Sequence, residues 1–275
     1  MPILNKDMSV CISLSGRPSN IGTRFHNALY DELGLNFVYK AFTTDDIEGA
    51  IRGVRALGIR GCSVSMPFKE AVIPLVDEIE PSAEAIASVN TIVNDGGVLT
   101  ASNTDYEAVA ELLAEHAVDP ALPVLLRGSG GMAKAVVAAF RGAGFDDLTV
   151  LARNEAAGRS LADAYGYRWT GTDPGPGFHS PGAAVLVNVT PLGMNGADAE
   201  ALAFSPAQIE GAEVVFDVVA FPSETPLVRA GRAAGRRLIT GAEVIALQAA
   251  RQFARYTGVT PTADQVARAS AFSRA

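Results

Sequence analysis

The sequence predicts an α/β protein of two lobes, the second of them a doubly wound domain of the Rossmann type. Three observations predict this architecture. Short apolar runs alternate with helix-like segments, the alternation forms two series on either side of a proline-containing break at residues 119–123, and the chain from residue 242 onwards has a helical pattern. Repeated β-α-β units imply right-handed crossovers and parallel strands, so each series predicts one sheet.

The first series contains seven elements and a hairpin. Strands are expected over residues 10–14, 37–41 and 61–65, and helices over residues 24–33, 45–57, 69–76 and 83–86. Gly34 and Gly58 follow two of these helices as stop residues. Short strands over residues 90–93 and 98–101 flank the turn Asn94-Asp95-Gly96-Gly97, and Asp-Gly and Gly-Gly between apolar runs are typical of a hairpin.

A helix over residues 106–115 precedes the proline-containing break, and the second series begins after it. Strands are then expected over residues 124–126, 148–151, 184–189, 213–217 and 238–239, and helices over residues 132–141, 156–165, 227–234, 242–256 and 262–272. The runs 184–189 and 213–217 are almost continuously apolar, which is typical of a parallel sheet covered on both faces. Residues 173–182 are rich in Pro and Gly and predict a surface loop.

Composition and charge exclude several classes of function. Of the 275 residues 48% are hydrophobic, enough for a large buried core. The formal net charge of −8 argues against a nucleic-acid partner, because neutralising phosphates requires a basic face. Residues 1–7 lack a basic start followed by an apolar run, and no apolar stretch reaches about 18 residues, so we expect a cytoplasmic protein without a membrane partner.

Cysteine and histidine give no sign of a metal site. Cys11 and Cys62 lie in strand-like runs and are expected to be buried free thiols, since neither belongs to a Cys-x-x-Cys pair. His26 is expected to pack or hydrogen-bond on a helix, and His116 and His179 to lie at the surface. No His, Asp or Glu cluster has the spacing of metal ligands, so we expect no metal.

A glycine-rich loop predicts a dinucleotide site. Gly128-Ser129-Gly130-Gly131-Met132-Ala133 fits G-x-G-x-x-A, follows a buried strand and opens an apolar helix. Gly128 would allow the tight turn, Gly130 the approach of a pyrophosphate, and Ala133 close packing of helix on sheet. The helix N-terminus would then supply free N–H groups and a positive partial charge.

The end of the next strand favours NADP over NAD. An NAD site usually has Asp or Glu there, for the ribose 2′-hydroxyl, whereas this strand end offers Arg153, which suits a 2′-phosphate. Glu155 lies just beyond and keeps NAD as an alternative, while Lys134 and Arg159 could add positive charge.

Three apolar strands of the first lobe end in polar residues, in the segments 65–69, 89–91 and 101–105. Open α/β sheets bind ligands at the carboxyl ends of their strands. Together these segments offer amides, hydroxyls, Lys69 and Asp105, which would suit a polyhydroxylated small molecule and a proton-transfer pair. Taken singly, Lys69 could equally be a solvated charge and Asp105 a helix N-cap.

Seven ordered motifs resemble those of the shikimate dehydrogenase family, over nearly the whole chain. They are Gly61-Cys-Ser-Val-Ser65-Met-Pro67-Phe-Lys69 for G-x-N-V-T-x-P-x-K, Val89-Asn90-Thr91, Asn103-Thr104-Asp105, Gly128-Ser-Gly130-Gly131, Asn188-Val-Thr190-Pro-Leu-Gly193-Met194, the 217–226 stretch for D-x-x-Y-x-P-x-x-T-P, and Gln248-Ala249.

The resemblance implies a role for each matching residue. Lys69 and Asp105 would be the catalytic pair. Substrate hydroxyls would be bound by Ser65, Asn90, Thr104 and Gln248. The cofactor would be contacted, or its site shaped, by Gly128, Ser129, Gly130, Gly131, Met132, Arg153, Asn154, Thr190, Val219 and Gly241. Family members interconvert 3-dehydroshikimate and shikimate with NADP, or use quinate and NAD in one branch.

The chain departs from the family pattern mainly in the substrate region. A family Ser-x-Ser pair that holds the substrate carboxylate is replaced by a stretch in which Ser19, Asn20 and Thr23 are candidates, with Ser13, Ser15 and Arg17 further back. The family Tyr of D-x-x-Y is Ala220, Tyr106 stands in place of a Gly, and Ala152 in place of an Asn. With these changes the chain resembles a branch of the family whose substrate site is altered.

The sequence therefore predicts an NADP-dependent oxidoreductase acting on shikimate or a close relative. Residues 1–105 plus 241–275 would form the substrate-binding catalytic domain and residues 106–240 the NADP-binding domain, with the C-terminal helices packing back on the first lobe so that Gln248 reaches the substrate. A quinate or aminated-analogue dehydrogenase and a non-catalytic NADP or metabolite sensor are the alternatives. The chain is expected to be a monomer or homodimer.

Overall fold

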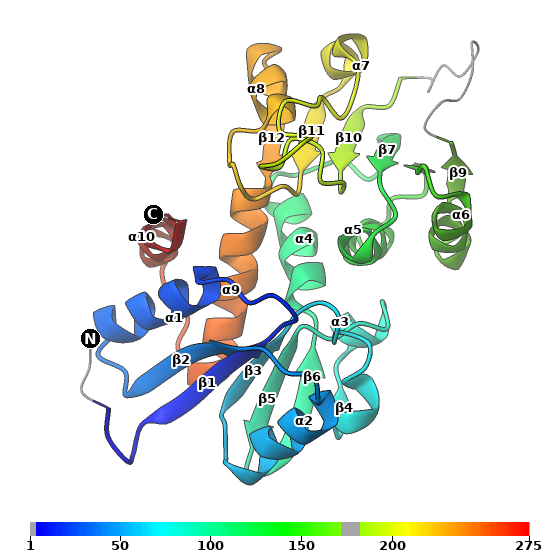
Figure 1. The fold of residues 1–275 in the computed structure, drawn as a ribbon. Helices are drawn as coiled ribbons and strands as arrows, with labels where there is room; N and C mark the ends of the chain where they lie inside the picture. Colours follow the sequence, from blue (N-terminus) through cyan, green and yellow to red (C-terminus); the bar gives the residue numbers. More distant parts are fainter. Residues whose placement is uncertain (1–3, 172–181, 275) are drawn as a thin grey trace. The chain divides into compact units, whose positions relative to one another are not determined.

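The computed structural model describes residues 4–171 and 182–274 of the chain (Figure 1). The contacts divide it into two compact units: residues up to Thr104 together with those from Ala246 onwards, and Asp105–Ile245. By these contacts Asp105 and residues 241–245 group with the second unit. His179 and nearly all of the predicted loop 173–182 lie outside the described residues.

The first unit is built from a six-stranded sheet and the helices that cover it. Its strands are β1 (Ser9–Leu14), β2 (Phe37–Phe42), β3 (Gly61–Val64), β4 (Glu78–Ile79), β5 (Thr91–Asp95) and β6 (Val98–Ser102). Its helices are α1 (Ile21–Glu32), α2 (Ile47–Ala56), the 3₁₀ turn η1 (Ile73–Leu75), α3 (Pro81–Glu84), α10 (Ala263–Arg274) and most of α9 (Gly241–Thr257).

The sheet of the first unit is mixed, with strand order β2-β1-β3-β5-β6-β4. The pairs β1–β2, β1–β3 and β4–β6 are parallel. The pairs β3–β5 and β5–β6 are antiparallel, and the second of them is the predicted hairpin. Because β5 reverses direction, residues just before its start lie beside the end of β3, which brings the segments 65–69 and 89–91 together.

Two apolar layers hold this sheet. On one face Ile51 and Val54 of α2 pack with Ile12, Cys62 and Ile92 of the strands. On the other face α1, α9 and α10 form a second core whose largest side chains are Phe25, Tyr30, Tyr39, Phe253 and Tyr256. The C-terminal helices thus belong to the first unit, as helical packing against its sheet requires.

The second unit is a doubly wound parallel sheet. Its strands are β7 (Val124–Arg127), β8 (Leu148–Leu151), β9 (Arg168–Thr170), β10 (Val185–Asn188), β11 (Val214–Asp217) and β12 (Arg237–Thr240). Its helices are α4 (Thr104–Glu115), which starts in the first unit, α5 (Gly131–Gly142), α6 (Glu155–Ala164), α7 (Pro206–Gly211) and α8 (Pro226–Ala233).

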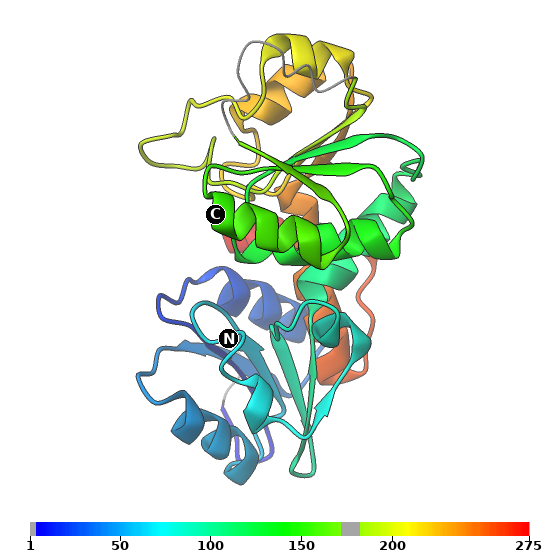
Figure 2. The ribbon, with the colours of Figure 1, turned by 90° about the vertical axis from the view of Figure 1, so that its right-hand side faces the viewer.

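The order β12-β11-β10-β7-β8-β9 places the reversal of strand order between β7 and β10. Figure 2 shows α5 on one face of this sheet and α7 and α8 on the other. Open α/β sheets bind their ligands in the crevice at such a reversal, beyond the carboxyl ends of the strands. The loops that follow Arg127 and Asn188 are therefore the expected ligand site of this unit.

The structure corrects one predicted helix and adds short elements. Residues 69–76 form turns and the 3₁₀ helix η1 rather than an α-helix. Pro74 lacks an N–H and disfavours the helical conformation of Ile73, and the Lys69 carbonyl accepts a bond from Val89 N at 2.8 Å instead of a helical N–H. The elements β4, β9 and α7 are too short to show a period in the sequence.

No helix in the part of the chain that the structure describes combines the length and apolar character needed to cross a bilayer.

Candidate functional site

The glycine loop after β7 has the geometry of a dinucleotide-binding turn. Gly128 has φ +125°, and a Cβ there would lie 2.8 Å from Val189 Cγ2, so the position requires glycine. Gly130 is the N-cap of α5 and makes no side-chain cap, and a Cβ at Gly130 or Gly131 would meet no atom within 4 Å. No side chain therefore covers the start of α5, where an anion can approach the backbone closely.

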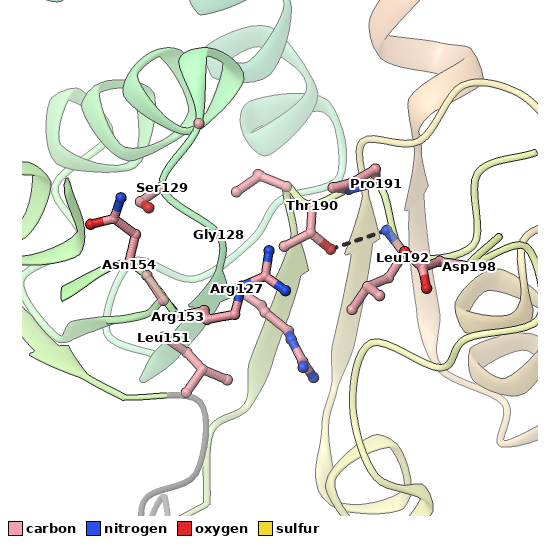
Figure 3. A pocket seen from close by; sticks show the side chains of 13 residues that line it. Arg127, Gly128, Ser129, Leu151, Arg153, Asn154, Thr190, Pro191, Leu192 and Asp198 are labelled. Carbon is pink, nitrogen blue, oxygen red and sulfur yellow. Dashed lines mark hydrogen bonds between the residues drawn. The ribbon is translucent and has the colours of Figure 1, made fainter. Parts of the chain in front are cut away.

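A pocket of about 310 Å³ opens at this loop. Its lining comes from the ends of β7, β8 and β10 and from the loops that follow them (Figure 3). The lining residues are Arg127, Gly128, Ser129, Gly130, Leu151, Ala152, Arg153, Asn154, Val189, Thr190, Pro191, Leu192 and Asp198. Six of the predicted cofactor residues are among them, whereas Gly131, Met132, Val219 and Gly241 are not.

Glu155, the carboxylate that could bind the ribose of NAD, already has an ion-pair partner. The Glu155 carboxylate pairs with Arg159 at 2.8 Å, and the Arg159 guanidinium lies over the Trp169 ring. The Asn154 side chain caps α6 by accepting from Ala157 N at 3.1 Å. Arg153 is consequently the side chain at the β8 end that has charge to offer a ligand, which favours a 2′-phosphate over a bare 2′-hydroxyl.

A buried polar network joins the loops after β10 and β11. Asn188 Oδ1 accepts from Thr190 N and Oγ1 at 3.1 and 2.6 Å, while its Nδ2 donates to Asp217 Oδ1 at 3.0 Å. Asp217 also accepts from Val219 N and from Thr225 Oγ1, and burial raises the pKa of its carboxyl. Thr190 and Val219 are thus positioned by one carboxylate and one amide.

Gly241 is required by packing rather than by a ligand. A Cβ at Gly241 would lie 2.4 Å from the carbonyl carbon of Val219 and 2.5 Å from that of Val218. Helix α9 can begin this close to the backbone after β11 only without a side chain at this position.

In the first unit the predicted substrate residue Asn90 is 3% exposed and anchors a cluster of hydrogen bonds. Its Oδ1 accepts from Thr91 Oγ1 at 2.8 Å and from Thr104 N and Oγ1 at 2.8 and 3.1 Å. The backbone donor Thr104 N fixes which end of the amide is oxygen. Among the described residues Asn90 Nδ2 has no hydrogen-bond partner, so a buried donor awaits an acceptor.

Helix α9 supports this cluster from the C-terminal segment. Gln252 Nε2 donates to Thr91 Oγ1 at 2.9 Å and to Asn90 O at 3.2 Å, and Gln252 Oε1 accepts from Ser63 Oγ at 3.0 Å. The predicted substrate residue Gln248 is half-buried one helical turn earlier, on the same face of α9. We call Ser63, Asn90, Thr91, Thr104 and Gln252 the Asn90 cluster.

The proposed catalytic pair divides between the units. Lys69 is half-buried and its backbone carbonyl is held by Val89 N, beside the start of β5. Ser65 is exposed at the end of β3, and its carbonyl accepts from Phe68 N. Asp105 lies in the first turn of α4, where the helix dipole favours a carboxylate. Lys69 and Ser65 are therefore held by backbone bonds within the first unit.

Comparison with known proteins decides the family. Residues 20–92 match the shikimate dehydrogenase substrate binding domain. The chain is 56% identical to a "shikimate dehydrogenase-like protein" of Haemophilus influenzae, over 99% of both chains. It is 38% identical to the "shikimate dehydrogenase (NADP(+))" of Chlorobaculum tepidum, over 88% of this chain and 87% of that one.

The chain belongs to the shikimate dehydrogenase family.

Solved structures of this family agree with the fold. The structure of the Thermus thermophilus shikimate 5-dehydrogenase, in complex with NADP(H) and shikimate, superposes with a TM-score of 0.84 at 28% identity. The match covers 97% of this chain and 100% of that one. The two-lobed α/β architecture with a Rossmann-type second lobe, predicted from the sequence, is thereby confirmed.

The stretch that differs from the shikimate dehydrogenase pattern lies at the start of α1. Asn20 is exposed at the N-cap of this helix and makes no side-chain cap. Thr23 is half-buried, and its Oγ1 has no hydrogen-bond partner within the described residues. Asn27 Nδ2 donates to Thr23 O and to Tyr39 O, which ties α1 to β2. Thr23 therefore presents an unused hydroxyl from a fixed backbone.

His26, Cys11 and Cys62 are buried in the first unit. Burial lowers the pKa of His26 to about 3, and its ring stacks on Tyr39 with centroids 4.4 Å apart. Burial raises the pKa of Cys11 to about 11 and also raises that of Cys62, and both are free thiols. Within residues 4–171 and 182–274 no group of His, Cys, Asp and Glu could hold a metal ion.

Sequence reasoning missed four residues of these sites. Gln252 repeats Gln248 at a spacing of four, a signal that was present in the sequence. Asn188 and Asp217 were noted as parts of motifs, but nothing in their spacing indicates that they bond to each other. The sequence pattern indicates only that Arg127 is the last residue of a buried strand. Its place in the pocket lining is known from the structure.

Proposed function

We propose that the chain is an NADP-dependent oxidoreductase that interconverts 3-dehydroshikimate and shikimate, or a close polyhydroxylated ring acid. The observation that carries the substrate class is the buried Nδ2 of Asn90, an amide donor without a partner among the described residues. Leaving such a donor unsatisfied costs about 1–3 kcal/mol, so its presence favours a ligand with an acceptor oxygen.

The Asn90 cluster suits a ring hydroxyl. Because Asn90 Oδ1 already accepts three hydrogen bonds, Nδ2 is held in one orientation and would donate to a substrate oxygen. Gln248 and Ser65 would donate to further hydroxyls, with Asn20 and Thr23 as candidates near the carboxylate end. Thr104 is fully buried and hydrogen-bonded to Asn90, so it would contribute by holding the Asn90 side chain in place.

The proton and the hydride take separate routes in the proposed reaction. In the oxidation direction Lys69 would take the proton of the ring hydroxyl, with Asp105 as its partner in the transfer. As that O–H bond breaks, the C–O bond becomes a carbonyl and hydride leaves the same carbon. NADP bound at the α5 N-terminus would accept this hydride, and supply it in the reverse direction. Gly128, Gly130 and Gly131 would leave room for the pyrophosphate, and Arg153 would pair with the 2′-phosphate.

A substrate panel tests the proposal. Purified protein is assayed with shikimate, quinate and an aminated analogue, each with NADP and with NAD, at the absorbance of the reduced nicotinamide. We expect the highest kcat/KM for shikimate with NADP. Faster turnover of quinate or of the aminated analogue would identify that compound, rather than shikimate, as the substrate. The absence of any turnover alongside intact NADPH binding would indicate a sensor.

A further inference from the structure

A second arginine lines the cofactor pocket beside the one that the sequence indicates. Arg127 is the last residue of β7, where it pairs in register with Leu151 of β8 and Asn188 of β10. It therefore lies between the ends of β8 and β10, on one of the two strands that flank the reversal of strand order. Figure 3 shows the side chains of Arg127 and Arg153 both extending into the pocket that these strand ends form.

Neither arginine is neutralised within the described part of the chain. Arg127 Nη1 donates to the carbonyl of Ala203, which anchors the side chain but leaves its charge uncompensated. No ion pair is formed there by Arg127 or Arg153, and Asp198, which also lines the pocket, pairs with neither. Most other arginines of this unit, such as Arg159 and Arg232, do have a carboxylate partner.

Partial burial makes the uncompensated charge of Arg127 costly. The side chain is half-buried, and loss of water lowers the pKa of its guanidinium. A cation stripped of part of its hydration gains more from a bound anion than an exposed one does. The half-buried Arg127 and the exposed Arg153, two cations in one pocket, match a group that carries nearly two negative charges, as a phosphate monoester does at neutral pH.

Arg127 directly precedes the glycine loop and also adjoins the end of β8. The pyrophosphate would be met by the free N–H groups at the start of α5. Arg127 instead adjoins Leu151, which leads directly to Ala152 and Arg153 at the β8 end. In a Rossmann-type domain this strand end is where the adenosine ribose is recognised.

We propose that Arg127 is a second specificity-determining residue, which binds the 2′-phosphate of NADP together with Arg153. This inference rests on the proposed function and assigns the preference for NADP over NAD to two strands rather than one. The guanidinium presents several N–H donors in one plane, so Arg127 can hold Ala203 O and a phosphate oxygen at once.

Binding measurements test the inference without relying on turnover. Titration calorimetry of the full chain compares NADPH with NADH, and 2′,5′-ADP with 5′-AMP, for wild type, Arg127→Ala, Arg127→Lys and Arg153→Ala. We expect Arg127→Ala and Arg153→Ala each to weaken NADPH and 2′,5′-ADP by about 10- to 100-fold, while NADH and 5′-AMP change less than about 3-fold. Arg127→Lys should retain part of the affinity and a steeper dependence on salt.

Arg232→Ala is the matched control, because Arg232 is exposed and paired with Glu224 outside the pocket. An equal loss for NADH and NADPH in Arg127→Ala would overturn the inference and assign Arg127 to adenine contact or to pocket shape. An unchanged NADPH affinity would overturn it as well. If the wild type binds neither NADPH nor 2′,5′-ADP, the proposed function fails with it, and that result is distinct from a failure confined to Arg127.

Discussion

The two candidate half-sites are built by different means. In the first unit the Asn90 cluster consists of side chains that satisfy one another, and one donor is left over. In the second unit the pocket at the glycine loop relies on backbone N–H groups and on two arginines without ion-pair partners in the described chain. The first arrangement is fixed before any ligand arrives, whereas the second carries charge that a ligand would complete.

This difference suggests two kinds of specificity. A buried, pre-oriented amide discriminates by geometry, because a ligand that cannot accept its hydrogen bond leaves it unsatisfied. A helix N-terminus and guanidinium groups discriminate by charge, and their effect falls with salt. The four predictions below test whether the half-sites are separable, starting from the largest expected effect.

The largest effect is expected from Lys69→Ala. Loss of the proton-transfer group should lower kcat by about 10²- to 10⁴-fold while NADPH affinity stays unchanged, because Lys69 belongs to the first unit. Steady-state kinetics and NADPH titration measure the two quantities. Lys6→Ala, which removes an exposed lysine, is the control. An unchanged kcat would remove Lys69 from the catalytic role.

Asn90→Asp isolates the unpartnered donor. The substitution keeps an acceptor for the three hydrogen bonds to Oδ1 but replaces Nδ2 with oxygen, so shikimate affinity should fall by about 10- to 100-fold. The measurement is the shikimate KM, with NADPH affinity alongside.

Asn94→Asp is the matched control for this change. Asn94 is also buried, in the strand β5 that follows Asn90, but its amide donates to Val54 O and its oxygen accepts from Gly97 N. It should lose stability without altering the shikimate KM. Equal effects of the two variants on KM would mean that Asn90 only supports the strand.

Gly130→Ala and Gly128→Ala separate ligand approach from backbone strain. A methyl group at Gly130 meets open space, so the variant should fold with a stability change within about 1 kcal/mol yet bind NADPH about 10-fold more weakly. At Gly128 the positive φ and the contact with Val189 should cost stability as well. Urea denaturation and NADPH titration give both numbers. Equal stability losses in the two variants would contradict this distinction.

The last prediction concerns stability rather than ligand binding, at His26 among the aromatic side chains of the first unit. An unfolded histidine titrates near pH 6.5, whereas burial lowers the pKa of His26 to about 3. As pH falls below 6.5 only the unfolded chain takes up this proton, so stability present above pH 6.5 is lost by about 1.4 kcal/mol per pH unit.

His26→Phe should remove this dependence, because phenylalanine can still stack on Tyr39. Urea denaturation of the variant and the wild type at pH 7 and pH 5 measures the difference in slope. Identical slopes would show that another group governs the acid sensitivity of the first unit.

The sequence was informative wherever one segment carries its own signal. The glycine loop could be placed because a buried strand precedes Gly128 and an apolar helix follows Gly131. The hairpin of β5 and β6 followed from Asp95-Gly96 between apolar runs. The strand-end rule also brought Asn90 and Thr104 into one group, and these two residues are hydrogen-bonded.

The features that the sequence did not predict depend on contacts between distant segments. The turns at residues 69–76 replace a helix because Val89 bonds to the Lys69 carbonyl, a contact with no local signal. The side chain of Arg127 faces a pocket through the pairing of β7 with β8 and β10, which a strand pattern cannot orient. Bonds such as Gln252 to Thr91 span 161 residues and leave no trace in spacing.

In the sequence the second unit is inserted between two segments of the first unit, and this has a consequence for synthesis on the ribosome. The second unit, Asp105–Ile245, emerges as one continuous segment and can fold as soon as it is complete. The Asn90 cluster must wait for Gln252, and the core around Tyr39 for Phe253 and Tyr256 of α9. The part of the chain made first is therefore finished last, and a nascent chain that has emerged from the ribosome only up to residue 245 would have a complete second unit while the sheet of the first unit is still uncovered.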